Sequence, residues 1–434
     1  MDALLGRLRG LNTLRVRGKV TNIVGLVVEG YCPSASVGTL CQLMPQDGGV
    51  PVAAEVVGFR DGRALLMPLG ELRGLGPGSL IQVLRSSATL PVGDELLGRV
   101  VDAMGEPIDG GPPPRLQSER AIYALPAGPM QRSTIREPLD LGVRAINALL
   151  SCGVGQRMGI MAGSGVGKSV LLGMMAKHAR ADVNVIALIG ERGRELREFI
   201  ENDLGEEGLK RSVVVCATSD QSPLLRMRGA FVATAIAEHF CAQGKSVLLM
   251  MDSATRFAMA MREVGLAIGE PPTTKGYTPS VFATLPKLLE RAGNFRAGGS
   301  ITGLYTVLVD GDDMNEPIAD AVRSILDGHI VLSRDLAAKN HFPAIDILAS
   351  TSRVMRAIVS ERQTNLAGQL REVLATYREA EDLVNIGAYS KGSNPRIDRA
   401  LGKIDNVNRF LRQDRESWVD FGATLAELEA LGLG

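Results

Sequence analysis

The segment that most restricts the possible folds is the glycine-rich run Ala162–Ser169, with the sequence Ala-Gly-Ser-Gly-Val-Gly-Lys-Ser. It follows an apolar run that we expect to form a strand, Met158–Met161, and it opens an apolar run that we expect to form a helix, Val170–His178. A P-loop requires this order of strand, loop and helix, because its glycines let backbone N–H groups turn toward phosphates at a helix N-terminus. The segment therefore predicts an α/β fold with a phosphate-binding site beside a strand end.

The same run predicts which groups hold the phosphates. Lys168 would reach the β- and γ-phosphates of a nucleoside triphosphate, and the Ser169 hydroxyl would ligate Mg²⁺. Ala162 replaces the first consensus glycine, at a position that requires a small residue more than a positive φ. A dinucleotide-binding loop is the alternative, with Glu191 at a plausible distance for a ribose, but Lys168 stands where that loop has its third glycine. The expected nucleotide contacts are Gly163, Ser164, Gly165, Val166, Gly167, Lys168 and Ser169.

Two further strand ends carry acidic residues. The apolar run Val247–Met251 ends in Asp252, which would hold Mg²⁺ beside the P-loop. The apolar run Val183–Ile189 is followed by Glu191 and Arg192, at the sheet edge where ligands bind in open α/β folds. Glu191 would polarise the water that attacks the last phosphate, and Arg192 would bind phosphate. The alternative for Glu191 is a solvated helix start, because acidic residues favour the first turn.

The first 91 residues predict a small β-barrel. Leu14–Val20 alternates apolar and polar residues, a hairpin turns at Asp61-Gly62, and Leu80–Leu84 supplies another strand. A short helix precedes the barrel, and we interpret it as a cap, with a docking helix for a partner as the alternative. Its apolar stripe is Leu4, Leu5, Leu8 and Leu11.

Residues 92–348 predict a parallel sheet covered by helices on both faces, because unbroken apolar runs alternate with helical segments. The other expected strands are Ser212–Thr218, Ser246–Met251, Ile301–Val309 and His329–Leu332. Residues 349–434 predict a helical domain whose apolar stripe favours a helix packed in a small bundle over a coiled coil. The stripe is Leu366, Leu370, Val373, Tyr377, Ala380 and Val384.

Composition argues against several classes of protein. The 48 basic residues balance 48 acidic ones, whereas a polyanion-binding surface normally shows a basic excess. The barrel segment contains only Tyr31 and Phe59 as aromatics, too few for a base-stacking nucleic-acid translocase. The five cysteines lack metal-type spacing, so we expect buried reduced thiols and no zinc site. No apolar stretch approaches the length of a membrane span, and we expect a cytoplasmic protein.

Several longer motifs carry a family resemblance over nearly the whole chain. They are Pro91–Val100, Gly190–Glu195, Gly269–Tyr277, Gly311–Pro317 and Ile325–Arg334. With these motifs the chain resembles the catalytic subunits of the rotary ATPase superfamily and, within it, the flagellar and type III secretion export ATPases. The resemblance implies a β-barrel, a RecA-like P-loop domain and a C-terminal helical domain, assembled as a homohexamer that hydrolyses ATP with Mg²⁺.

The resemblance also implies roles for individual residues. Glu191 matches the catalytic carboxylate, and Arg192 matches a phosphate-binding arginine. Phe342 matches the aromatic that stacks on adenine. Arg353 matches the arginine finger that enters the neighbouring subunit's site; without the resemblance it would be interpreted as a surface arginine at a helix start. Tyr389 is a weaker candidate for the adenine pocket, with core packing as the alternative.

The function implied by the resemblance is that of a motor subunit for protein export through the flagellar type III secretion apparatus. The implied partners are a central stalk, regulatory or stator proteins, export chaperone–substrate complexes and the membrane export gate, without nucleic acid. The implied location is cytoplasmic, peripheral to the inner-membrane export apparatus. The loop Gly269–Pro279 would face the central pore, or else serve as an ordinary long connection.

Alternative functions remain. The segments Leu172–Ala176 and Asp382–Gly387 resemble export ATPases more than a rotary ATP synthase subunit. A catalytically dead structural subunit should lack Lys168 or Glu191, and both are present. A virulence-type secretion ATPase is the closest alternative, and Met259–Glu263 with the segment beginning at Asp382 favours the flagellar type.

Overall fold

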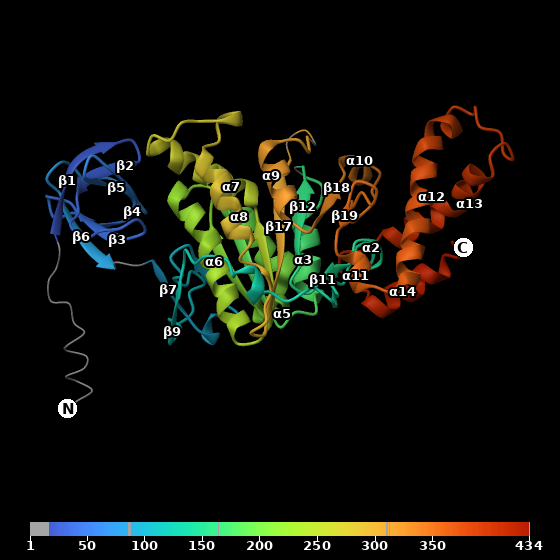
Figure 1. Ribbon diagram of the computed structural model, residues 1–434, viewed down its shortest axis with the longest axis horizontal. Helices are drawn as coiled ribbons and strands as arrows, with labels where there is room; N and C mark the ends of the chain where they lie inside the picture. Colours follow the sequence, from blue (N-terminus) through green and yellow to red (C-terminus); the bar gives the residue numbers. More distant parts are fainter. Residues whose placement is uncertain (1–16, 86–87, 164, 310, 312, 434) are drawn as a thin grey trace.

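The computed structural model describes residues 17–85, 88–163, 165–309, 311 and 313–433. The expected leading helix lies outside these residues, as does the beginning of the first expected strand. The chain forms an elongated molecule with a barrel at one end, a large sheet in the middle and helices at the other end (Figure 1). The predicted fold class, a barrel followed by an α/β domain and a helical region, is confirmed.

Six antiparallel strands close the barrel in the order β1-β2-β5-β4-β3-β6. Its core consists of alternate residues of these strands, such as Val20, Leu43 and Leu66, because successive strand side chains point to opposite faces. The predicted hairpin turns through Asp61 and Gly62, both with positive φ, as a two-residue hairpin turn requires. The strands are β1 (Arg17–Val24), β2 (Val27–Tyr31), β3 (Leu40–Met44), β4 (Val52–Arg60), β5 (Arg63–Pro68) and β6 (Leu80–Arg85).

The central sheet has the strand order β19-β18-β12-β17-β15-β13-β14-β8, with β16 paired to β17. The strands from β18 to β8 run parallel, so their C-terminal ends share one side, which we call the carboxyl edge. The strands are β8 (Val100–Asp102), β12 (Arg157–Ala162), β13 (Val183–Ile189), β14 (Ser212–Ala217), β15 (Ser246–Asp252), β16 (Gly293–Asn294), β17 (Ser300–Leu308), β18 (Gly328–Leu332) and β19 (Thr351–Ser352). Smaller pairs are β7 (Thr89–Val92) with β9 (Ser118–Ala121), and β10 (Pro138–Leu139) with β11 (Cys152–Gly153).

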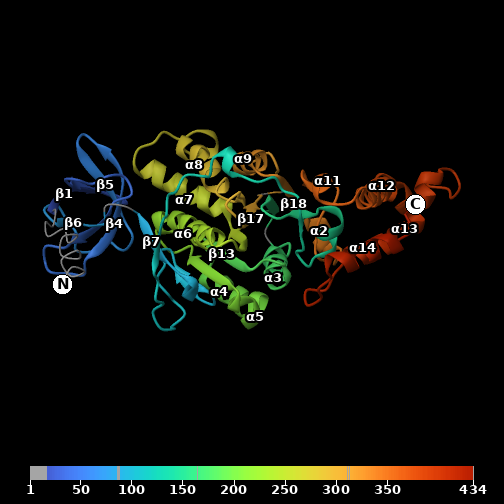
Figure 2. The same ribbon diagram turned by 60° about the horizontal axis from the view of Figure 1, so that its bottom comes forward.

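Helices cover both faces of this sheet (Figures 1 and 2). Val185 and Val215 belong to the core on one face, together with residues of α6, α7, α8 and α9, whereas Ile186 and Val214 belong to the core on the other face, together with residues of α3 and the C-terminal helices. Burial on both faces explains the unbroken apolar runs in the sequence. The helices are α2 (Arg144–Leu149), α3 (Lys168–His178), α4 (Gly193–Glu198), α5 (Gly205–Lys210), α6 (Pro223–Ala242), α7 (Ala254–Ala267), α8 (Pro279–Leu289), α9 (Pro317–Ile325), α10 (Arg334–Ala338) and α11 (Met355–Ile358).

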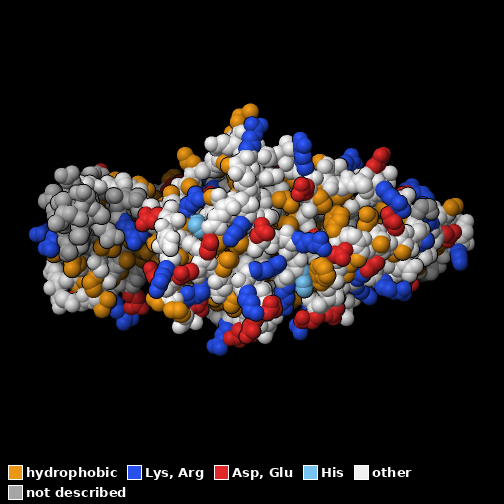
Figure 3. Space-filling model, turned by 90° about the horizontal axis from the view of Figure 1, so that it is seen from below, with side chains coloured by type: hydrophobic (Ala, Val, Ile, Leu, Met, Phe, Trp, Pro, Cys, Tyr) orange, Lys and Arg blue, Asp and Glu red, His pale blue; other side chains and the backbone are white. Residues whose placement is uncertain are grey.

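The C-terminal region contains α12 (Glu361–Asn385), α13 (Pro395–Leu411) and α14 (Phe421–Ala430). Leu370, Val373 and Ala380 of the predicted stripe are buried, which confirms a helix packed in a bundle. All five cysteines are buried and unpaired. On the face shown in Figure 3, basic and acidic side chains are interspersed. Among the described residues, no helix has the length and apolar character to cross a membrane.

A buried ion pair ties the barrel to the central domain. Arg228 Nη1 of α6 lies 2.7 Å from Glu55 Oε2 of β4, and the Tyr123 hydroxyl donates to Glu55 Oε1 at 2.7 Å. Replacing Arg228 with alanine leaves the buried Glu55 carboxylate without its cationic partner. We expect the free energy of unfolding to fall by about 3–5 kcal/mol. Denaturant unfolding followed by circular dichroism measures this change.

The matched control is Arg194→Ala, which removes an exposed pair with Glu198 on the surface of α4. Exposed pairs contribute little, so the unfolding midpoint of this variant should match that of the wild type. Equal midpoints for the Arg228 and Arg194 variants would show that the buried pair does not hold the barrel in place.

Candidate active site

The P-loop begins at the carboxyl edge of the sheet, where β12 ends at Ala162. Gly165 and Gly167 have φ values of 80° and 89°, a left-handed conformation that glycine adopts without steric cost. Gly167 caps α3, which starts at Lys168. Ser164 lies outside the described residues. The turn therefore places the N-terminus of α3, with its backbone N–H groups, at the carboxyl edge, as phosphate binding requires.

Three charged side chains meet beside this loop. Lys168 Nζ lies 2.5 Å from Asp252 Oδ1 and 3.6 Å from Glu191 Oε1. Asp252 ends β15, Glu191 follows β13, and Lys168 follows β12 and the P-loop, so the three residues are placed by different strands that end at the same edge. The structure thus brings together the lysine and the two carboxylates that the sequence analysis assigned to one site.

Burial and charge together set the protonation of these groups. Burial lowers the pKa of Lys168, but the Asp252 and Glu191 carboxylates outweigh this effect and raise it above its ordinary value. Burial also raises the pKa of Glu191, and nearby Asp252 adds to this, while Lys168 opposes it. Glu191 is therefore a better proton acceptor than an exposed glutamate, and Lys168 remains a cation.

The oxygen atoms at this edge fit Mg²⁺. Two carboxylates share one ammonium group, and Glu191 Oε1 is buried without a hydrogen bond. The exposed hydroxyl of Ser169, on the first turn of α3, supplies a third oxygen. Mg²⁺ prefers hard oxygen ligands, of which one or two are carboxylates. Asp252 and Ser169 are the residues that would hold it.

Arg256 was not predicted from the sequence, and the structure places it at the same site. It lies on the first turn of α7, and its side chain packs against Gly190, where an added Cβ would lie 2.8 Å from Arg256 Cβ. Its charge acts on the pKa of Glu191, and its Nε is buried without a hydrogen bond. An arginine four residues after the strand-ending Asp252 was the available signal. Arg256 adds positive charge where phosphates would lie.

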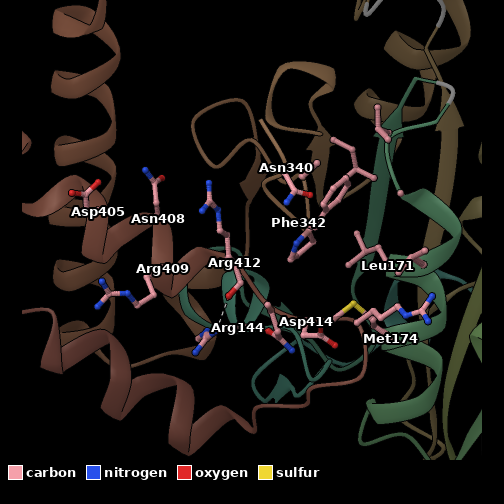
Figure 4. A pocket seen from close by; sticks show the side chains of 18 residues that line it. Arg144, Leu171, Met174, Asn340, Phe342, Asp405, Asn408, Arg409, Arg412 and Asp414 are labelled. Atoms are coloured by element: carbon pink, nitrogen blue, oxygen red, sulfur yellow. Dashed lines mark hydrogen bonds between the residues drawn. The ribbon is translucent and has the colours of Figure 1, made fainter. Parts of the chain in front are cut away.

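A cavity of about 1000 Å³ opens beside the P-loop. Figure 4 shows Phe342, Leu171 and Met174 on one side of it and α13 side chains on the other. Phe342 Cε1 would lie 3.6 Å from a Cβ added at Gly167, so its ring faces the end of the P-loop. The residues from α13 and the following loop are Asp405, Asn408, Arg409, Arg412, Gln413, Asp414 and Arg415. An aromatic ring beside the loop suits a stacked base.

Other predicted site residues lie elsewhere. Arg192 is exposed at the start of α4, 3.6 Å from Glu195. Tyr389 lies between α12 and α13, where its hydroxyl bonds the Asn394 carbonyl and Asp398 Oδ1, both at 3.0 Å. It does not line the cavity that contains Phe342, and the structure does not bring these two aromatics together.

Arg353 is exposed and lies far from the P-loop of its own chain. It follows β19, which pairs antiparallel with the beginning of β18, and its backbone N–H donates to the Asp327 carbonyl. Asp327 lies beside Arg157 at the start of β12, whereas the P-loop begins after Ala162. The five residue steps of strand from Arg157 to Ala162 span about 16 Å. Arg353 therefore cannot reach the phosphates held by its own P-loop.

Comparison with known proteins agrees with this geometry. Residues 142–352 match the family model described as ATP synthase alpha/beta family, nucleotide-binding domain, and residues 359–430 match the T3SS EscN ATPase C-terminal domain. The chain is 54% identical to the flagellum-specific ATP synthase of Bacillus subtilis, over 95% of this chain and 94% of that protein. The chain belongs to the flagellar and type III secretion ATPase family. It is thus an ATP-hydrolysing enzyme, as predicted.

Both branches of the family resemble this ATPase closely. The type 3 secretion system ATPase of Xanthomonas euvesicatoria is 51% identical, over 98% of this chain and 96% of that protein. The structure of the assembled ATPase EscN from the type III secretion system of enteropathogenic E. coli matches with a TM-score of 0.91 and 46% identity, over 96% of this chain and all of that chain. A second EscN structure, in complex with its central stalk EscO, matches with a TM-score of 0.88 and 45% identity, over 96% of this chain and all of that chain.

Proposed function

We propose that this ATPase is one subunit of a homohexameric ring that powers protein export, with each active site shared between two subunits. One observation carries the proposal: Lys168, Glu191 and Asp252 meet at the P-loop, while the exposed Arg353 is out of reach of that loop. A site that needs Arg353 must receive it from a neighbour. The assembled EscN, which matches over nearly the whole chain, supports a ring.

The proposed chemistry assigns one task to each residue. Backbone N–H groups of the P-loop hold the phosphates, and Lys168 turns from the carboxylates to the β- and γ-phosphates. Glu191 accepts a hydrogen bond from the attacking water and orients it. Asp252 and Ser169 would hold Mg²⁺, which would offset phosphate charge when bound. Arg353 of the neighbouring subunit offsets the charge that develops on the transferred phosphoryl group.

Two further arginines complete the proposed phosphate environment. Arg256 is half-buried, and its side chain packs against Gly190, next to Glu191, with its Nε buried. Arg192 is exposed, and its assignment to phosphate rests on the resemblance and on its position directly after Glu191. We therefore expect Arg256 to contribute more to phosphate binding than Arg192 in the arrangement seen here.

Phe342 is the residue that we propose to stack on adenine. Base stacking on an aromatic ring contributes about 1–3 kcal/mol, so Phe342→Ala should weaken ATP binding about tenfold. Phe342→Tyr should bind like the wild type, because the ring is retained. Tyr389→Ala should also bind ATP like the wild type, because the Tyr389 hydroxyl forms hydrogen bonds with Asn394 and Asp398, outside the cavity. Titration with a fluorescent ATP analogue tests all three; unchanged binding by Phe342→Ala would rule out stacking.

Two segments on the carboxyl-edge side suit contact with a central stalk. The loop Gly269–Pro279 lies at the top of Figure 1, and its base is held by Glu270, which accepts from the Ser280 N–H at 2.8 Å. The end of α12 and the connection to α13 lie on the same side and expose Leu383 and Ile386. The EscN–EscO complex supports a stalk as partner. Regulators, chaperone–substrate complexes and an export gate at the inner membrane are proposed on the family resemblance.

We propose that the chain belongs to the flagellar branch, because the segments Met259–Glu263 and Asp382–Gly392 resemble flagellar ATPases. The virulence branch is the alternative, and the 51% identity to a type 3 secretion system ATPase supports it. The test places the chain in two strains of one bacterium, each lacking one of its two export ATPases. Restored motility is the expected result. Restored effector secretion without motility would assign the chain to the virulence branch, and restoration of neither would contradict an export function.

A further inference from the structure

The carboxylate of Asp252 accepts two hydrogen bonds on the same oxygen. Lys168 Nζ lies 2.5 Å from Oδ1, and Thr306 Oγ1 lies 2.7 Å from Oδ1. Thr306 is fully buried on β17, the strand between β12, which carries the P-loop, and β15, which ends in Asp252. Its hydroxyl also lies 3.3 Å from the Met251 carbonyl, but the carboxylate is the closer acceptor. No function proposed above uses this threonine.

The two donors differ in what nucleotide binding would do to them. Lys168 is a flexible cation that is expected to turn toward the phosphates, which removes it from Oδ1. Thr306 is neutral and short, and its β-branched side chain is stiff within a strand. Among the donors recorded in the described chain, Thr306 is the one that would still hold Asp252 after Lys168 leaves.

The strand that carries Thr306 is itself fixed to the helix that follows Asp252. Thr255 Oγ1, on the first turn of α7, accepts a hydrogen bond from the Leu308 N–H at 2.8 Å. Thr306 and Thr255 therefore join β17 to the chain on both sides of the Asp252–Ser253 peptide. Because Thr306 lies on a strand that is fixed in this way, its hydroxyl can set the orientation of the Asp252 carboxylate.

We propose that Thr306 is a positioning residue that anchors Asp252 through Oδ1 and leaves Oδ2 as the acceptor for Mg²⁺ or for a water bound to it. The proposal rests on the proposed role of Asp252 in holding Mg²⁺. The orientation of Asp252 matters because Mg²⁺ requires near-ideal octahedral coordination. Groups that orient a metal ligand affect metal affinity although they do not touch the metal.

Three variants of Thr306 and one control variant isolate the contribution of the hydroxyl. Thr306→Val removes the hydroxyl at nearly constant side-chain volume, and Thr306→Ser retains the hydroxyl. Thr302→Val is the matched control, because Thr302 is equally buried on β17 and points the same way along the strand, four residues earlier. Its hydroxyl accepts from the Gly155 N–H instead. Thr306→Ala repeats the first comparison with a smaller side chain, so that the result does not depend on how well valine packs.

The measurement is the affinity for a fluorescent ATP analogue at a series of free Mg²⁺ concentrations, and separately with EDTA. We expect Thr306→Val and Thr306→Ala to need about 10–100 times more Mg²⁺ for half-maximal binding. Their affinity with EDTA should equal that of the wild type. Thr306→Ser and Thr302→Val should show the wild-type Mg²⁺ dependence.

An unchanged Mg²⁺ dependence in Thr306→Val and Thr306→Ala would overturn the inference. So would an equal loss of affinity with Mg²⁺ and with EDTA, because this would indicate a general structural role. If the wild type itself bound the analogue without any Mg²⁺ dependence, the proposed metal role of Asp252 would be contradicted instead. The two failures are therefore distinguishable in one experiment.

Discussion

Replacing Glu191 with glutamine is expected to reduce the steady-state rate of ATP hydrolysis by about 10²–10⁴-fold, the usual contribution of a positioned general base. Glutamine keeps the size of the side chain but cannot accept the proton of the attacking water. ATP binding should persist, because Lys168 and the P-loop are unchanged. The matched control is Glu198→Gln, an exposed glutamate on the same helix α4, which should hydrolyse ATP like the wild type. Full activity of Glu191→Gln would remove this residue from the mechanism.

The pH dependence of the rate tests the same assignment. Burial raises the pKa of Glu191, and the base must be unprotonated to act. Activity should therefore fall as the pH falls through this raised pKa, at a higher pH than for an exposed glutamate. An acid limb of the rate at the ordinary glutamate position would contradict the proposed role of the buried carboxylate.

Replacing Arg353 with alanine is expected to reduce the rate of hydrolysis by about 10³–10⁵-fold, the contribution measured for arginine fingers supplied in trans. Arg353→Lys should also be strongly impaired, because lysine lacks the planar fork that binds two phosphoryl oxygens. Arg356→Ala provides a matched control, since Arg356 is an exposed arginine three residues later on α11. Similar rates for the Arg353 and Arg356 variants would show that Arg353 has no special role.

Much of the central sheet could be predicted from the sequence. The strand Val183–Ile189 has the predicted bounds, because a strand buried on both faces leaves an unbroken apolar run. The meeting of Glu191 and Asp252 also follows from sequence, since parallel strands end at one edge. The exact start of α3 did not follow: the helix begins at Lys168 and not at Val170, because Gly167 serves as its cap.

Long-range contacts set the limit of prediction. The contact between Thr306 and Asp252 joins residues on neighbouring strands that are 54 positions apart, and no local pattern marks it. The barrel order β1-β2-β5-β4-β3-β6 depends in the same way on which strands pair. The only sequence feature that pointed to Arg256 was its position four residues after Asp252. The sequence makes Tyr389 a weak candidate for the adenine pocket, and only the fold shows that its hydroxyl forms hydrogen bonds with Asn394 and Asp398.

Mixed rings of two inactive variants give the most direct test of a site shared between subunits. Glu191→Gln and Arg353→Ala are co-expressed with different tags, and assemblies carrying both tags are purified. An interface is complete where an Arg353→Ala subunit supplies the P-loop and Glu191, and a Glu191→Gln subunit supplies Arg353. Random assembly makes about a quarter of the interfaces complete, so hydrolysis should rise far above that of either variant, toward that fraction of the wild-type rate. A mixed assembly as inactive as its two components would contradict the shared site.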